Sequence, residues 1–201
     1  MSDIDRREAL HILAGVPVAA ALDVSPAAVQ RAVRAANGSR QSSIPYAPTF
    51  FTAHEYDTVR MLADLVIPRD ERSGSATDAG VPEFMDTLLA EQSESSQTAI
   101  RGGLAWLDTE CRERFGKSFL DSAEAERQGV LDDIAWPARA RPELSHGVAF
   151  FNRFRDLTAS GFWSSRMGVE DLQYMGNTVV SEWTGCPEEQ LRKLGVRYED
   201  R

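Results

Sequence analysis

The chain has 201 residues, of which 42% are hydrophobic and 26% charged, so it is long enough to bury one hydrophobic core. Its formal net charge of −9 argues against a nucleic-acid partner, because phosphate binding needs a basic surface, and against charge-driven docking on an anionic membrane. No apolar run approaches the roughly 18 residues of a membrane-spanning helix, so we expect no direct membrane span.

Residues 1–22 have the features of a twin-arginine export signal. Arg6 and Arg7 precede a weakly apolar run, and the alanines at 19–21 supply an A-x-A cleavage pattern. Such a signal carries folded proteins across the bacterial inner membrane, which predicts a periplasmic location. Acidic residues around the arginine pair weaken the pattern. The alternative is an amphipathic N-terminal helix with the two arginines on its polar side.

Residues 23–51 are expected to form a short helix followed by an extended arm. Pro26 suits the first position of a helix that runs to about residue 36, where Asn37 and Gly38 stop it. The following residues are rich in Ser, Pro and Gly and favour a linker or arm. We therefore expect a helical domain over residues 52–201.

The first helix of that domain begins with a strong local signal. Thr52 and Glu55 have the spacing of a capping box, and the apolar spacing predicts a helix to about Ile67. Gly80 and Pro82 then lead into a second apolar helix.

A third, longer helix is predicted over residues 95–115, with Gly116 as its cap. The adjacent Gly102 and Gly103 weaken this helix by about 1 kcal/mol each relative to alanine. Two glycines in a helix interior predict the close approach of another helix.

Two further main helices follow. Asp121 and Glu124 have capping-box spacing and predict the start of a helix that Pro137 ends. A helix around Phe150 is amphipathic, and Gly161 is expected to end it. Shorter helices are expected near residues 169–173, 176–183 and 187–194. The sequence thus predicts an all-α, single irregular domain of about five main helices.

Large aromatic residues gather in short, glycine-broken segments. Such residues form either the floor of a core or a docking surface for another protein, and the sequence leaves both open. The candidate docking residues are Phe50, Phe51, Phe162, Trp163, Tyr174 and Trp183.

Motifs for catalysis, cofactors or metals are missing. No glycine-rich nucleotide loop, nucleophile elbow or zinc motif occurs, and His11, His54 and His146 show no triad spacing. Adjacent carboxylates such as Asp132 and Asp133 do not face each other on a helix. We therefore predict no catalytic, cofactor-binding or metal-binding residue in this chain. A stand-alone enzyme with a site of scattered carboxylates is the alternative.

Cys111 and Cys186 are the two cysteines. In an exported protein they are candidates for a disulfide, within the chain or with another chain. The alternative is a pair of buried thiols.

Three blocks of sequence, at residues 62–89, 106–119 and 161–179, resemble the gluconate 2-dehydrogenase subunit 3 family in the same order. The first contains the AGVPxFxD pattern. Members of that family are small helical subunits that pair with a large FAD-containing dehydrogenase of the glucose-methanol-choline class. That partner oxidises a sugar, glycoside, sugar acid or polyol, and electrons often leave through a cytochrome c subunit.

The resemblance implies that this chain binds no flavin itself, and that it stabilises the catalytic subunit and escorts it through the export system. A free periplasmic interaction module, or chaperone that releases its client, is a second alternative.

Overall fold

The computed structural model describes residues 25–41, 45–173, 182 and 185–198. Every regular element in this part of the chain is helical, which confirms the all-α prediction. Six of the helices have ten or more residues: the five main helices expected, and α2, which was expected as a short helix before the domain. In chain order the elements are α2 (Pro26–Gln41), α3 (Ala53–Val66), α4 (Val81–Ala90), α5 (Glu94–Phe115), α6 (Glu124–Ala135), a 3₁₀ turn (Pro142–Leu144), α7 (Ser145–Ser164), α8 (Arg166–Asp171) and α9 (Glu188–Leu194).

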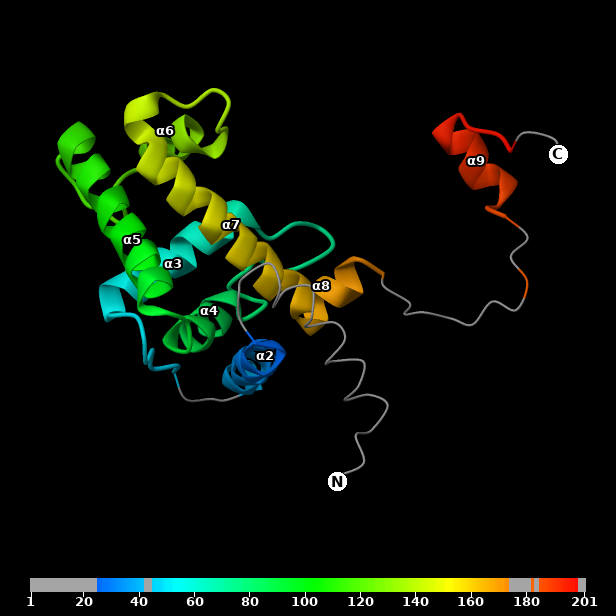
Figure 1. Ribbon diagram of the computed structural model, residues 1–201, viewed down its shortest axis with the longest axis horizontal. Helices are drawn as coiled ribbons and strands as arrows, with labels where there is room; N and C mark the ends of the chain where they lie inside the picture. The colour runs from blue at the N-terminus through cyan, green and yellow to red at the C-terminus, as the bar shows by residue number, and fades with distance from the viewer. Residues whose placement is uncertain (1–24, 42–44, 174–181, 183–184, 199–201) are drawn as a thin grey trace.

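The arrangement centres on α7. Figure 1 shows α7 running through the domain, with α6 near one end and α8 at the other. Helices α3, α4 and α5 also contact α7, and their apolar faces form one buried core with it. No residue of α9 is buried.

Two local signals are confirmed at atomic detail. The Thr52 hydroxyl accepts a hydrogen bond from the Glu55 N–H at 3.2 Å, and Glu55 accepts one from the Thr52 N–H at 2.8 Å. This reciprocal pair starts α3 as predicted. Gly116 ends α5 with a φ of 71°, a left-handed conformation that glycine adopts without strain.

The predicted capping box at Asp121 and Glu124 is wrong. Ser118 bonds Asp121 instead: its hydroxyl donates to the carboxylate at 2.6 Å and accepts from the Asp121 N–H at 3.2 Å. Because Asp121 is thereby held in the preceding turn, α6 begins later. Its first turn is closed by Glu126, which accepts a hydrogen bond from the Ala123 N–H at 2.6 Å.

Gly161 does not end α7. The helix continues to Ser164, and Gly161 is buried within it. A Cβ at this position would lie 2.8 Å from Cδ1 of Phe84, so the glycine allows α4 to approach α7 closely. The chain turns only at Ser165, whose hydroxyl accepts a hydrogen bond from the Gly168 N–H at the start of α8.

The predicted close approach at the glycine pair is confirmed for Gly103 and not for Gly102. A Cβ at Gly103 would lie 1.9 Å from the Phe150 ring, whereas nothing lies within 4 Å of one at Gly102. The contact is reciprocal, because Trp106 of α5 lies over Gly147 of α7, with 2.5 Å from its ring to a Cβ placed there. On each helix, a glycine leaves room for an aromatic ring of the other helix.

The helical body begins earlier than residue 52. Helix α2 continues through Asn37 and Gly38 to Gln41, and its buried residues are small: Ala28, Val29, Ala32 and Ala36. They belong to the same core cluster as the residues of α4, against which α2 packs (Figure 1). The helix thus runs five residues beyond Ala36, past the Asn-Gly pair that was expected to stop it.

Candidate functional site

Asp86, the acidic residue of the AGVPxFxD pattern, holds the segment before α3 against α4. Its side chain is fully buried and accepts five hydrogen bonds. Its Oδ2 accepts from the Tyr46 hydroxyl at 2.8 Å, from the Thr49 N–H at 2.8 Å and from the Thr49 hydroxyl at 3.0 Å. Its Oδ1 accepts from the Phe50 N–H at 3.0 Å and from the Phe51 N–H at 2.9 Å. Burial and the hydrogen bond to Asp86 raise the pKa of Tyr46 to about 12. Since both carboxylate oxygens are saturated, Asp86 is a structural anchor rather than a general base.

A second carboxylate, Asp108 of α5, links three segments. It accepts hydrogen bonds from the Phe119 N–H at 3.0 Å and from Arg112 at 2.9 Å, and lies 2.7 Å from Nε2 of His54. Burial by itself would raise the pKa of Asp108. The Phe119 N–H, His54 and Arg112 outweigh it and hold the pKa below its usual value.

The His54–Asp108 pair has the geometry in which a carboxylate orients a catalytic histidine, but it has no nucleophile. Among the described residues, no serine, threonine or cysteine side chain hydrogen-bonds the imidazole ring of His54, and the Thr58 hydroxyl donates only to the His54 backbone carbonyl, at 2.9 Å. His54 is exposed at the start of α3, and His146 is exposed at the start of α7. The pair therefore joins α3 to α5 without completing a triad.

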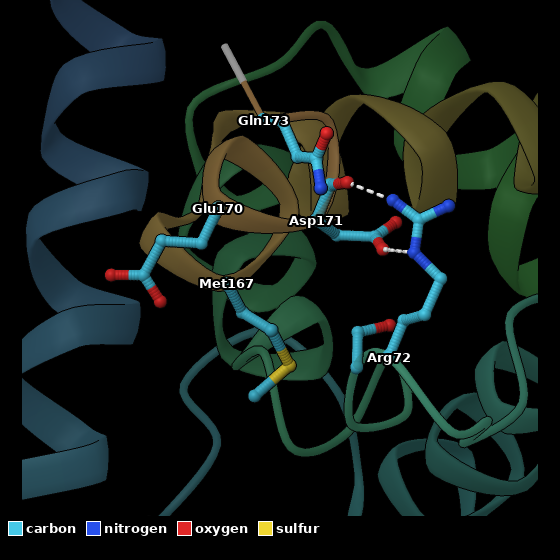
Figure 2. Close-up of a pocket in the computed structure, with 6 residues that line it drawn as sticks. Arg72, Met167, Glu170, Asp171 and Gln173 are labelled. Atoms are coloured by element: carbon cyan, nitrogen blue, oxygen red, sulfur yellow. Dashed lines mark hydrogen bonds and ion pairs between the residues drawn. The ribbon is translucent and has the colours of Figure 1, made fainter. Parts of the chain in front are cut away.

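An open pocket of about 280 Å³ lies between α8 and the loop after α3. Figure 2 shows Arg72 reaching Asp171, while Glu170 points away from them. Arg72 donates to the Asp171 carbonyl, and its Nε lies 3.3 Å from Oδ1 of the same residue. The pocket is lined by Arg72, Ser73, Met167, Glu170, Asp171 and Gln173. Because its main charges already neutralise each other, it offers no clear ligand chemistry.

Metal-ligand clusters and helices able to span a membrane are both absent from the part of the chain that the structure describes. No group of three or more His, Cys, Asp or Glu side chains among the described residues is arranged to hold a metal ion. None of the helices described is both long and apolar enough to cross a bilayer.

The six aromatic residues expected at a docking surface fall into three groups. Phe50, Phe51 and Phe162 are buried in the core of the chain itself, which favours the core interpretation for them. Trp163 is 39% exposed, and its ring meets Phe162 edge-on at 4.9 Å. Tyr174 and Trp183 lie outside the described residues, as do Arg6 and Arg7 of the export pattern.

Trp136 is an exposed aromatic residue that the sequence did not single out. It follows the last residue of α6 and is 61% exposed, more than Trp163. The available signal was its position directly before Pro137, where a helix stops and its apolar face no longer buries a side chain.

Both cysteines are free thiols. Cys111 is buried in α5, and burial raises the pKa of its thiol. Cys186 is exposed shortly before α9. Cys111 is thus shielded from a thiol of another chain, whereas Cys186 is accessible to one.

Comparison with known protein families identifies the family of this chain. A family model described as gluconate 2-dehydrogenase subunit 3 matches residues 53–182, from the first residue of α3 to beyond α8. The chain belongs to the gluconate 2-dehydrogenase subunit 3 family. The anchor Asp86, the Asp108 cluster and Trp136 all lie within the region matched to subunit 3, whereas α2 lies outside it. No curated protein and no solved structure matches the chain.

Proposed function

We propose that this chain is the non-catalytic small subunit of a large FAD-dependent dehydrogenase of the glucose-methanol-choline type. The observation that carries the proposal is its membership of a family described as a subunit of gluconate 2-dehydrogenase. The partner would oxidise a sugar, glycoside, sugar acid or polyol and would pass electrons to an acceptor such as a cytochrome c subunit. The role of this chain would be to bind and stabilise that partner.

The chemistry of the described residues supports a binding role. The two buried carboxylates with several partners, Asp86 and Asp108, are occupied by donors within the chain. By contrast, the exposed tryptophans Trp136 and Trp163 leave large apolar rings in solvent. Tryptophan is enriched where one protein binds another.

The proposal includes export in the folded state. Residues 1–22 would act as the twin-arginine signal, and the assembled complex would reside in the periplasm, attached to the inner membrane only through other subunits. Helix α2 begins four residues after the signal and packs on the core, so a signal at this position would be joined directly to a folded body.

Co-expression with a neighbouring large flavoprotein gene, with the affinity tag on this chain alone, tests the proposal. We expect a stoichiometric yellow complex after size exclusion, with flavin absorbance that dyes and sugar substrates bleach. Expressing the flavoprotein without this chain is the control and should lower its soluble yield. A colourless single chain that stays folded in the presence of the flavoprotein would overturn the proposal.

A further inference from the structure

The turn between α6 and α7, residues 136–141, presents a tryptophan and two arginines to solvent. We refer to it as the Trp136 turn. Trp136 is 61% exposed, and Arg139 and Arg141 are exposed beside it in sequence. Tryptophan and arginine are the residue types that most often dominate the binding energy of protein interfaces.

The backbone of the Trp136 turn is held in one conformation. The Trp136 carbonyl accepts hydrogen bonds from the Arg139 N–H at 2.9 Å and from the Ala140 N–H at 3.0 Å. Pro137 and Pro142 restrict φ on either side. A side chain on such a turn loses little backbone entropy when it is buried by a partner, so Trp136 is pre-organised for binding.

The turn is positively charged on an acidic protein. Asp133 is the carboxylate that approaches it, and it already accepts a hydrogen bond from Arg114 at 2.7 Å, while Arg141 lies 3.7 Å away. None of the described residues supplies a partner for the Arg139 side chain. Residues 136–141 contain two arginines and no acidic residue, and Arg139 in particular would complement an acidic side chain of a partner.

We propose that the Trp136 turn is the main docking site for the large flavoprotein subunit, an inference that rests on the proposed function. Trp136 enters an apolar pocket of that subunit, and carboxylates at the rim of the pocket meet Arg139 and Arg141. A second copy of this chain fits less well. In a two-fold dimer the same patch faces itself, so the arginines of the two copies would repel.

The opposite end of α7 is a weaker candidate. Trp163 at that end packs edge-on against Phe162, which covers part of its ring. The cation nearest in sequence, Arg166, lies 2.7 Å from Glu170 and is thus already paired. Neither feature matches the exposed ring and unpaired cation of the Trp136 turn.

The test measures binding of tagged variants to the flavoprotein subunit across a range of salt concentrations. We expect Trp136→Ala to raise the dissociation constant by at least about 30-fold, and Trp136→Phe to have a smaller effect. Arg139→Glu should also weaken binding, most strongly at low salt. The matched control for the charge reversal is Arg166→Glu, at the opposite end of α7, which should bind within about threefold of the unmodified chain.

The outcomes separate the two proposals. If the unmodified chain binds the flavoprotein and the Trp136 and Arg139 variants bind equally well, the docking site is wrong and the subunit role stands. If the unmodified chain does not bind any flavoprotein, the subunit role fails and the docking site fails with it. If the isolated chain is a dimer that Trp136→Ala converts to a monomer, the turn is a homodimer contact and the inference is overturned. Thermal unfolding of the isolated variants should match the unmodified chain, because the substituted side chains are exposed.

Discussion

At the scale of single residues, two buried carboxylates hold together segments that are distant in the sequence. Asp86 binds the segment that precedes α3, and Asp108 binds both His54 of α3 and the Phe119 N–H. A buried charge persists only where donors replace its lost hydration. Each carboxylate has several, so removing either one leaves a set of buried donors without an acceptor.

Replacing Asp86 with alanine should lower the free energy of unfolding by about 3 kcal/mol, because up to five donors lose their acceptor. Tyr46→Phe is the matched control: it removes one of the five bonds and should cost about 1 kcal/mol. Urea unfolding of both variants gives the comparison. Equal losses would show that Asp86 is not the anchor of this segment.

Asp108 should make stability depend on pH. Its pKa is lower in the folded chain than the ordinary value of 3.8, so the folded state binds fewer protons than the unfolded state in that range. Its contribution is present above pH 3.8 and is lost as the pH falls through the folded pKa.

We therefore expect Asp108→Asn to destabilise the chain near neutral pH and to differ less from the unmodified chain as acid is added. Urea unfolding between about pH 3 and pH 7 measures this. Asp132→Asn removes an exposed carboxylate and serves as the control. A difference between Asp108→Asn and the unmodified chain that stays constant with pH would contradict the assignment.

At the scale of elements, the crossing of α5 and α7 is set by glycines under aromatic rings. The Phe150 ring packs on Gly103, and the Trp106 ring packs on Gly147. A methyl group at either glycine would overlap a ring, so the helices would have to separate. Gly161 has the same role where α7 meets α4.

The neighbouring glycines of α5 allow a direct comparison. Gly103→Ala should destabilise the chain by about 2 kcal/mol, since its Cβ would lie 1.9 Å from the Phe150 ring. Gly102→Ala should be stabilising by up to about 1 kcal/mol, because the position is exposed and alanine favours the helix. Thermal and urea unfolding test the opposite signs. A loss of stability in both variants would point to helix bending rather than ring contact.

At the scale of the whole molecule, the hydrophobic core includes residues outside the region that matches the family. The match begins at residue 53, yet α2 covers α4 with four buried residues. A chain starting at residue 25 and one starting at residue 45 both lack the export pattern and both keep the segment that Asp86 binds, so they differ by α2 and the few residues that follow it. We expect the shorter chain to have a clearly lower urea midpoint and to bind the dye ANS, which reports exposed apolar surface. Equal midpoints would show that α2 is dispensable.

The export proposal concerns the whole complex. Replacing Arg6 and Arg7 by lysine should leave assembly with the flavoprotein intact and should retain its dehydrogenase activity in the cytoplasmic fraction. Cell fractionation followed by a dye-reduction assay measures this. Normal periplasmic activity in the double variant would exclude the twin-arginine route for this chain.

Much of the helical framework could be predicted because its signals act over one turn. The Thr52–Glu55 capping box, the cap at Gly116 and the buried spacing of α3 are local, and all three are confirmed. The family resemblance likewise rested on short blocks that the match at 53–182 contains. The exposure of the aromatic side chains was predicted less well, because Phe50, Phe51 and Phe162 are buried and the exposed Trp136 was not among the six candidates.

The sequence by itself determined the all-α class, most helix starts and the family. Only the tertiary structure decided that Gly161 lies inside α7, that α2 passes Asn37, and that Asp86 and Asp108 bind donors 35 and 54 residues away. The physical reason is the separation along the chain between the residues that interact. A cap or a proline acts within a few residues of backbone, whereas burial of a ring and satisfaction of a carboxylate depend on which distant segments the fold brings together.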